Sequence, residues 1–169
     1  MIRPILKFGD PPLHQRAADV GELTDDIQHL IDDLIETMYA APGIGLAAPQ
    51  VGISLRIFAI DLSLGHQAED LMVFINPSFL EREGMQLEEE GCLSLPGFNA
   101  TVARPSRAVI TAMDRAGQER VVEGADLLAR AFQHEMDHLE GIVFPDRLRG
   151  IKRDLIVRKI RKLTRTGKW

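Results

Sequence analysis

The stretch at residues 133–141, with the sequence QHEMDHLEG, constrains this chain more than any other. A helix turns about 100° per residue, so His134 and His138 would stand on one face, one turn apart. Glu135 follows the first histidine directly, so its carboxylate can reach a water on a metal held by both imidazoles without being a ligand. The pattern predicts a hydrolytic metal site. The alternative is a chance match on an ordinary amphipathic helix.

The surroundings of the two histidines favour the metal site. Apolar side chains occur on nearly every side of the expected helix, which indicates a helix buried all round. They are Leu127, Leu128, Ala131, Phe132, Met136 and Leu139. In a buried helix, the polar side chains of His134, Glu135 and His138 are costly unless each forms a bond. A metal ion with its bound water would satisfy all three. We expect Asp126 as the N-cap and Gly141 as the C′ residue of a helix of about four turns.

Segments of strand-like composition precede this helix. They span residues 55–60, 71–75 and 78–87, the last interrupted at Gly84, and a later pair at 108–113 and 119–122 reads as a β-hairpin. Such closely spaced strands imply antiparallel sheets. A first helix at residues 24–40, capped by Thr24, and a terminal third helix complete the pattern. The predicted class is α+β, with antiparallel sheets packed around the buried central helix.

The composition suits one globular domain over residues 1–169, since 45% of the chain is hydrophobic and 27% is charged. The amino terminus lacks the apolar run and cleavage site of a signal peptide, and no stretch is long enough to span a bilayer. We therefore expect a cytoplasmic protein without a membrane partner. The single cysteine, Cys92, excludes a disulfide framework and is free to act as ligand, nucleophile or core residue.

The net charge of −5 is distributed unevenly. Residues 147–169 contain ten Lys or Arg and one acidic residue, so this tail carries +9 and the preceding body carries −14. The acidic body argues against general or sequence-specific nucleic-acid binding. Apolar residues recur at helical spacing in the tail and predict a basic helix at residues 151–165, docked by one stripe. The stripe comprises Ile151, Leu155, Ile156, Ile160 and Leu163.

The first helix leads into a glycine-rich segment at residues 43–52, GIGLAAPQVG. Its glycines and small alanines let the backbone lie close against another surface, which suits the wall of a cleft. A phosphate-binding loop is disfavoured because no Gly-Lys-Ser/Thr ending is present. Gln50 is the one strongly polar side chain in the segment. It could tie down the loop, or its amide could donate to a developing oxyanion.

Cys92 lies in a second distinctive segment, EGCLSLPG at residues 90–97. It precedes His134 by 42 residues, too far for a shared metal-binding turn but easily brought close by a sheet packed on the helix. A buried structural thiol is the alternative. Because the two histidines still need a third ligand, we expect Cys92, His134 and His138 to hold a metal that keeps one coordination position open for chemistry.

Three of these segments together resemble the peptide deformylases. That family is marked by Gly-x-Gly-x-Ala-Ala-x-Gln, matched at residues 43–50, and by Glu-Gly-Cys-Leu-Ser, matched at residues 90–94. It is also marked by His-Glu-x-x-His-Leu with Asp before the second His, matched at residues 134–139. Each motif alone is suggestive, whereas all three in the family's order are highly specific. The resemblance covers essentially the whole chain.

The resemblance implies hydrolytic removal of the formyl group from the N-terminal formylmethionine of newly made polypeptides, with release of formate. It implies one divalent metal ion per chain, with Fe²⁺ as the working metal and Zn²⁺, Ni²⁺ or Co²⁺ as substitutes, although nitrogen and sulfur ligands favour zinc on general grounds. Carried over by position, the site residues are Cys92, His134 and His138 as metal ligands, Glu135 as general base and acid, Gln50 and the Leu93 N–H as oxyanion donors, and Gly45 as a backbone contact for substrate. Glu90, paired with Arg104, is expected to orient the cysteine loop.

The partners implied are formylated nascent polypeptides and, through the basic C-terminal helix, the ribosome, whose surface is largely RNA phosphate. Two other functions compete with this one. An ordinary zinc peptidase would share the helix motif, but its third ligand normally lies downstream, where Glu140 is too close in sequence to join the same metal. A ribosome-binding protein with a structural metal would need a fourth protein ligand, and none is evident.

Overall fold

The computed structural model describes residues 1–169 and contains three α-helices and seven β-strands. The helices are α1 (Asp25–Ala40), α2 (Asp126–Leu139) and α3 (Lys152–Arg165). The strands are β1 (Gly45–Ala47), β2 (Ile57–Ile60), β3 (Met72–Glu83), β4 (Gln86–Gly91), β5 (Asn99–Arg104), β6 (Arg107–Met113) and β7 (Glu119–Ala125). All pairs are antiparallel, in a five-stranded sheet of order β1-β2-β3-β6-β7 and a two-stranded sheet of β4 and β5. The predicted α+β class is confirmed.

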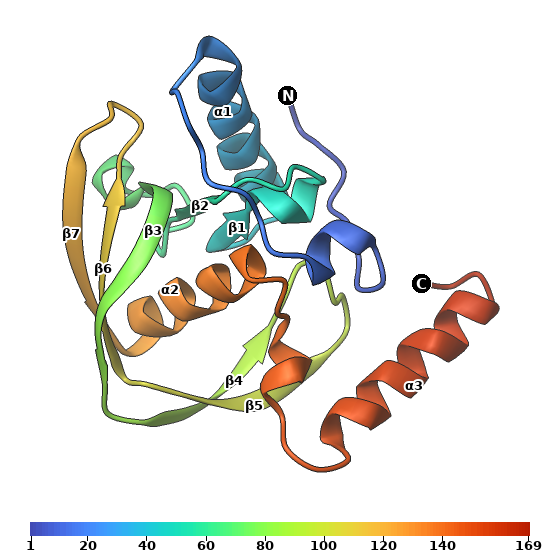
Figure 1. Ribbon diagram of the computed structural model, residues 1–169. Helices are drawn as coiled ribbons and strands as arrows, with labels where there is room; N and C mark the ends of the chain where they lie inside the picture. Colours follow the sequence, from blue (N-terminus) through green and yellow to red (C-terminus); the bar gives the residue numbers. More distant parts are fainter.

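Helix α2 lies at the centre of the molecule, with the larger sheet curving around it and β4 and β5 passing along another side (Figure 1). Phe132 of α2 belongs to the same apolar cluster as Phe58, Phe74 and Ile110 of the larger sheet. The rings of Phe58 and Phe74 stack with centroids 4.8 Å apart, and Phe132 meets Phe74 edge-on at 5.4 Å. Such close packing allows one rotation of the helix, and so it fixes the direction in which the two histidines point.

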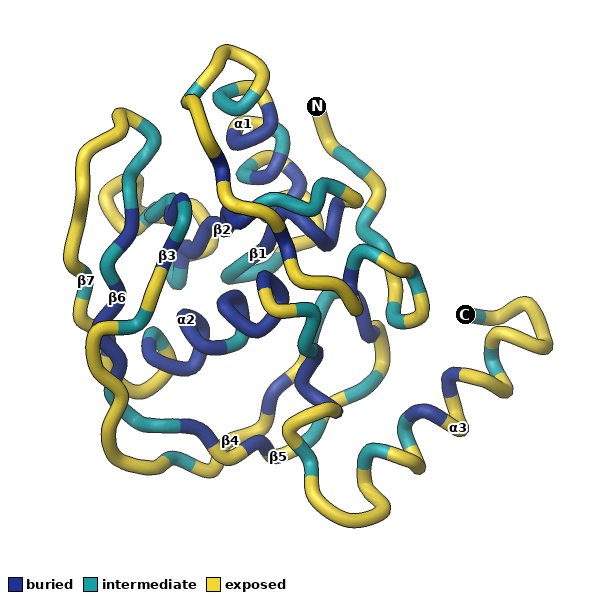
Figure 2. The backbone as a smooth tube through the Cα atoms, in the orientation of Figure 1, coloured by how far each residue is buried: buried dark blue, intermediate teal, exposed yellow.

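The first turn of α2 differs from the prediction. Asp126 is the first helical residue and not the N-cap, and the preceding Ala125 makes no side-chain cap hydrogen bond. The reason is that β7 runs directly into α2, with the Asp126 N–H donating to the Ser106 carbonyl at 2.9 Å and φ at +52°. Leu127 is 52% exposed, so the helix is enclosed only from Ala129 onward (Figure 2). The expectation of burial on all sides was wrong for this turn.

The C-terminal end of α2 is as predicted. Glu140 is the C-cap residue, Gly141 follows with φ +74°, and the Ile142 N–H donates to the Asp137 carbonyl at 2.8 Å. A Cβ at Gly141 would lie 2.7 Å from the backbone nitrogen of Gln15. The left-handed backbone and the close neighbour both require glycine here.

The strands predicted at residues 71–75 and 78–87 are largely parts of a single strand, β3. Strand β3 continues through Asn76 and Pro77, where its register with β6 shifts between Ile75 and Ser78. Proline cannot donate to a sheet, and a register irregularity accommodates it. The predicted segment 78–87 crosses the turn at Gly84, which has φ +76° and separates β3 from β4. Strands β1 and β5 were not predicted.

The terminal helix α3 spans the predicted region and docks by part of the predicted stripe, with Ile160 buried and Ile156 and Leu163 half-buried. Val157 and Ile160 are buried, whereas Ile151 is 69% and Leu155 is 47% exposed. Ile160 joins a small apolar cluster with Leu95, Val102, Val143 and Phe144. Leu95 of that cluster lies three residues after Cys92, so α3 packs against the segment that follows the cysteine. None of the three helices is long and apolar enough to cross a membrane.

Candidate active site

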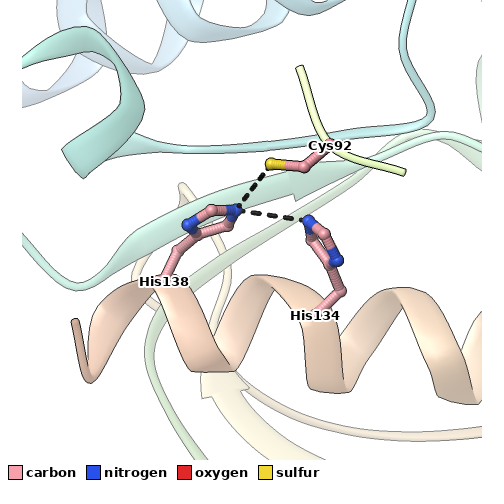
Figure 3. A group of neighbouring side chains, drawn as sticks. All are labelled: Cys92, His134 and His138. Atoms are coloured by element: carbon pink, nitrogen blue, oxygen red, sulfur yellow. Dashed lines mark hydrogen bonds between the residues drawn. The ribbon is translucent and has the colours of Figure 1, made fainter. Parts of the chain in front are cut away.

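The structure brings the three predicted donors, Cys92, His134 and His138, together (Figure 3). The two histidines project from one face of α2, with their Nε2 atoms 3.2 Å apart. Cys92 follows β4 directly and places its Sγ 3.4 Å from the Nε2 of His138. One donor atom from each residue lies within 4.8 Å of the others. A single cation could therefore contact all three.

Glu90 orients the first histidine. Its Oε1 lies 2.5 Å from the Nδ1 of His134, which leaves Nε2 directed at the cluster. Arg104 donates to both Glu90 oxygens at 2.8 and 2.6 Å, which confirms the predicted pair, and Arg130 donates to Oε2 at 2.5 Å. Burial raises the pKa of Glu90, but hydrogen bonds from Arg104 and His134 outweigh burial and hold that pKa well below its usual range. The carboxylate is thus a fixed anion.

His138 is fully buried at the back of the site. Burial, reinforced by the neighbouring His134 and Arg104, lowers the pKa of His138 well below its ordinary value. Its imidazole is therefore neutral at physiological pH, which is the form that binds a metal. The Nδ1 of this ring has no hydrogen-bond partner in the chain.

Glu135 lies beside the cluster and is 4% exposed. Burial raises the pKa of its carboxyl to about 7, and its Oε2 has no hydrogen-bond partner. A buried carboxyl without a partner is costly to folding, so it indicates a site built for chemistry. A Cβ at Gly45 would lie 2.7 Å from the Oε1 of Glu135. Only glycine allows β1 to approach the carboxyl this closely.

Gln50 both ties down its loop and points at the cluster. It lies in the 3₁₀ turn Ala48–Val51, is 1% exposed, and accepts the Ala47 N–H at 3.0 Å. Its Nε2 lies 3.1 Å from the Ser94 hydroxyl and 3.7 Å from the Sγ of Cys92. The Leu93 N–H donates no hydrogen bond within the chain. The two predicted oxyanion donors are therefore held next to the donor cluster.

These residues surround a cleft of about 340 Å³. Its walls come from β1, from β4 with the cysteine loop, and from the first turns of α2. The lining residues are Gly43, Ile44, Gly45, Gln50, Glu89, Glu90, Gly91, Cys92, Leu93, Leu127, Arg130, Ala131, His134 and Glu135. Of the predicted site residues, only His138 is absent from the lining, because it lies fully buried behind the others.

Sequence reasoning missed several residues that support the site. Arg130 is 4% exposed, and besides Glu90 it donates to the Val102 carbonyl at 2.8 Å. A lone arginine between the apolar residues of a helix expected to be buried was the signal that could have found it. Ser94, which is 0% exposed and holds Gln50, had no comparable signal, because a small hydroxyl is common in loops.

The donor set fits a divalent metal ion. It combines a sulfur with two imidazoles, one neutral and the other anchored by Glu90, and transition metals such as zinc and ferrous iron accept all of these ligands. With three protein donors, a bound ion would keep a coordination position for chemistry, as in catalytic sites.

An α+β fold whose buried His-Glu-x-x-His helix meets a cysteine at a cleft provides a group of side chains that could hold one metal ion. The family model described as polypeptide deformylase matches residues 2–154. A peptide deformylase from Acidobacterium capsulatum is 49% identical over 169 residues, covering 100% of this chain and 99% of the relative. The chain therefore belongs to the polypeptide deformylase family, whose members are hydrolases of protein biosynthesis.

Solved structures agree with this assignment. A peptide deformylase from Legionella pneumophila superimposes with a TM-score of 0.91 at 40% identity, covering 99% of this chain and 98% of the other. A peptide deformylase from Synechococcus elongatus, solved in complex with actinonin, gives a TM-score of 0.88 at 37% identity, covering 95% and 90% of the two chains. The resemblance in the three motifs thus extends to the whole fold.

Proposed function

We propose that this enzyme removes the formyl group from the N-terminal formylmethionine of newly synthesised polypeptides and releases formate, using one metal ion held by Cys92, His134 and His138. The observation that carries the proposal is the position of Glu135. Its buried, unpartnered carboxyl lies beside three converging metal donors on the lining of a cleft. A carboxyl in that position can handle a proton but is not needed to complete the ligand set.

Each residue then has one task in the reaction. The bound cation supplies Lewis acidity, which lowers the pKa of a water molecule and polarises the formyl carbonyl. Glu135 accepts a proton from the attacking water and returns it to the departing amine. The Gln50 amide and the Leu93 N–H donate to the developing oxyanion, where one donor is typically worth roughly 3 kcal/mol. Gly45 provides a backbone contact for the substrate beside the reacting carbon.

Formate release from formyl-Met-Ala tests the function. We expect stoichiometric formate and free Met-Ala, with no cleavage of the Met–Ala bond and no action on acetyl-Met-Ala. An ordinary zinc peptidase would instead cleave internal peptide bonds. A protein with a purely structural metal would leave both peptides intact, and either of these results would overturn the proposal.

We predict that ferrous iron is the working metal. A thiolate-bound ferrous ion is open to oxygen, so activity of anaerobically purified enzyme should decay in air and return when nickel or cobalt is added. The measurement is metal content and formate release before and after aeration. Full activity with zinc, unaffected by air, would contradict the choice of iron.

The basic tail is proposed to hold the enzyme on the ribosome, and the site of action is then the cytoplasm, where nascent chains emerge. Arg158, Lys159, Arg161 and Lys162 are exposed on α3 and take part in none of the ion pairs of the chain. Helix α3 itself lies at the edge of the molecule (Figure 1). Four unpaired cations on an otherwise acidic protein favour contact with RNA phosphate. No sequence-specific recognition is proposed.

Replacing these four residues by Gln should leave turnover of formyl-Met-Ala within about twofold, because the site lies before α3 in the chain. Ribosome co-sedimentation should weaken, with a smaller dependence on salt, since each lost phosphate contact reduces the salt slope by roughly 0.7–0.9. Charge replacement is preferable to truncation, because Ile160 is a core residue and Trp169 packs against Phe98 at 5.8 Å.

The matched control neutralises four arginines of the acidic body by the changes Arg16→Gln, Arg82→Gln, Arg115→Gln and Arg120→Gln. This variant loses the same number of positive charges and should retain ribosome binding better than the α3 variant. Equal sedimentation of the two variants would show that α3 is only a solvated helix.

A further inference from the structure

A buried carboxylate, Asp137, is shared by two arginines from different parts of the chain. Arg147, in the 3₁₀ turn Phe144–Arg147 between α2 and α3, donates to Oδ1 at 2.6 Å and to Oδ2 at 3.0 Å. Arg104, at the end of β5, donates to Oδ2 at 2.9 Å. The side chain of Asp137 is 10% exposed, and Arg147 is the only residue that donates to Oδ1.

The guanidinium of Arg104 donates to two carboxylates, those of Glu90 and Asp137. Its Nε and Nη2 are bound by the two oxygens of Glu90, and only its Nη1 reaches Asp137. Glu90 in turn holds the Nδ1 of His134 at 2.5 Å. A planar guanidinium and a carboxylate are strongest as a two-bond pair, and Arg104 forms two bonds with Glu90 but one with Asp137. The pair with Glu90 persists because Asp137 already has a two-bond partner in Arg147.

We propose that Arg147 is a positioning residue for His134, acting through Asp137, Arg104 and Glu90. Without Arg147, a buried Asp137 oxygen loses its partner, and Arg104 turns towards Asp137 to satisfy it. Glu90 then loses part of its anchor, and the imidazole of His134 is held less firmly towards the donor cluster. This proposal rests on the assignment of His134 as a metal ligand in the proposed function.

Metal retention by Arg147→Gln tests the relay without substrate. Loss of a group that orients a ligand typically reduces metal affinity by about 10–100-fold, and Arg147 acts through three further residues, so we expect metal release to a chelator to accelerate by about 3–10-fold. The cobalt-loaded variant should also show an altered sulfur-to-cobalt absorption band. Arg147→Lys preserves the charge but only part of the two-bond contact. Its metal-release rate should therefore fall between those of the wild type and Arg147→Gln.

The matched control is Arg153→Gln. Arg153 lies in the next helix, is 43% exposed against 44% for Arg147, and also pairs with an aspartate, Asp146, at 2.9 Å. It has no contact with the relay, so its metal release should equal that of the wild type. If Arg147→Gln releases metal at the wild-type rate, or if Arg153→Gln accelerates release equally, the relay is refuted.

The experiment separates this inference from the proposed function. Absence of formate release by the wild-type enzyme would refute the function. If the wild type releases formate but Arg147→Gln releases metal at the wild-type rate, only the relay is refuted. If Arg147→Gln does not fold, Arg147→Lys carries the same comparison, and wild-type metal release by that variant together with normal unfolding would overturn the proposal.

Discussion

Glu135→Gln is expected to keep the metal and lose turnover by at least about 10²–10⁴-fold, which is the range that a positioned general acid and base supplies. Glutamine has nearly the same shape as glutamate but cannot accept a proton. Gly45 leaves just enough room for this side chain, since a Cβ there would lie 2.7 Å from the Oε1 of Glu135, so an isosteric change avoids repacking β1. The measurement is formate release per bound metal ion.

The control for this prediction is His138→Ala, which removes a metal donor. That variant should lose both metal and activity, whereas Glu135→Gln should lose activity alone. Burial raises the pKa of Glu135 to about 7, so the ionised carboxylate is less stable in the folded protein than in water. Replacing it by glutamine removes this cost. The Gln variant should therefore unfold at the same temperature as the wild type or higher. Metal loss by Glu135→Gln would show that the residue is a ligand and that its role is misassigned.

Glu90→Ala is expected to lower the free energy of unfolding of the metal-free protein by about 3–5 kcal/mol, which is typical when one partner of a buried ion pair is removed. Glu90 is the only carboxylate that binds Arg130, and it binds Arg104 with two bonds; both guanidinium groups are 5% exposed. Neither arginine can be deprotonated, so both would remain as poorly compensated buried charges. Chemical denaturation of both proteins measures the difference.

Two comparisons test the physical cause of this loss. Glu123→Ala removes an ion pair to Arg107 of 2.6 Å, as short as the shorter Glu90–Arg104 contact, but Glu123 is 61% exposed and its loss should be far smaller. Folding lowers the pKa of Glu90, so its contribution is complete above the ordinary value of 4.5 and shrinks as the pH falls towards the folded value. The difference between wild type and Glu90→Ala should therefore narrow below about pH 4.5. A difference that is equal for Glu90 and Glu123 would rule out buried charge as its cause.

Prediction from the sequence worked where a local rule governs the geometry. The four-residue spacing of His134 and His138 fixes two imidazoles on one helical face, whatever the helix packs against. Gly141 and Thr24 were predicted correctly as helix-end residues for the same reason, since capping depends on backbone within one turn. Asp126 was predicted wrongly because its backbone is bound by Ser106, a residue 20 positions earlier that no local rule considers.

The apolar stripe predicted for α3 was correct only in part. Helical spacing correctly placed Ile160 in the docked face of α3, but the structure exposes Ile151 and Leu155, which were predicted there, and buries Val157, which was not. Periodicity shows that a helix has an apolar side, whereas the angle at which it meets its neighbours decides which residues are covered. Strand β5 was missed although its burial alternates, because six residues with Asn, Ala and Arg have little strand preference of their own.

The sequence by itself determined the chemistry of the site: two imidazoles one turn apart, a carboxyl next to the first, and the thiol of the single cysteine. That the thiol joins them was expected from the need for a third ligand, but only the tertiary structure shows the contact, because Cys92 and His138 are 46 residues apart and meet where β4 lies beside α2. It also decided that Asp137 lies between Arg104, 33 residues away, and Arg147, 10 residues away. Helical geometry reaches a few residues along the chain, whereas hydrogen bonds between distant side chains depend on how sheets and helices pack, and no short pattern encodes that packing.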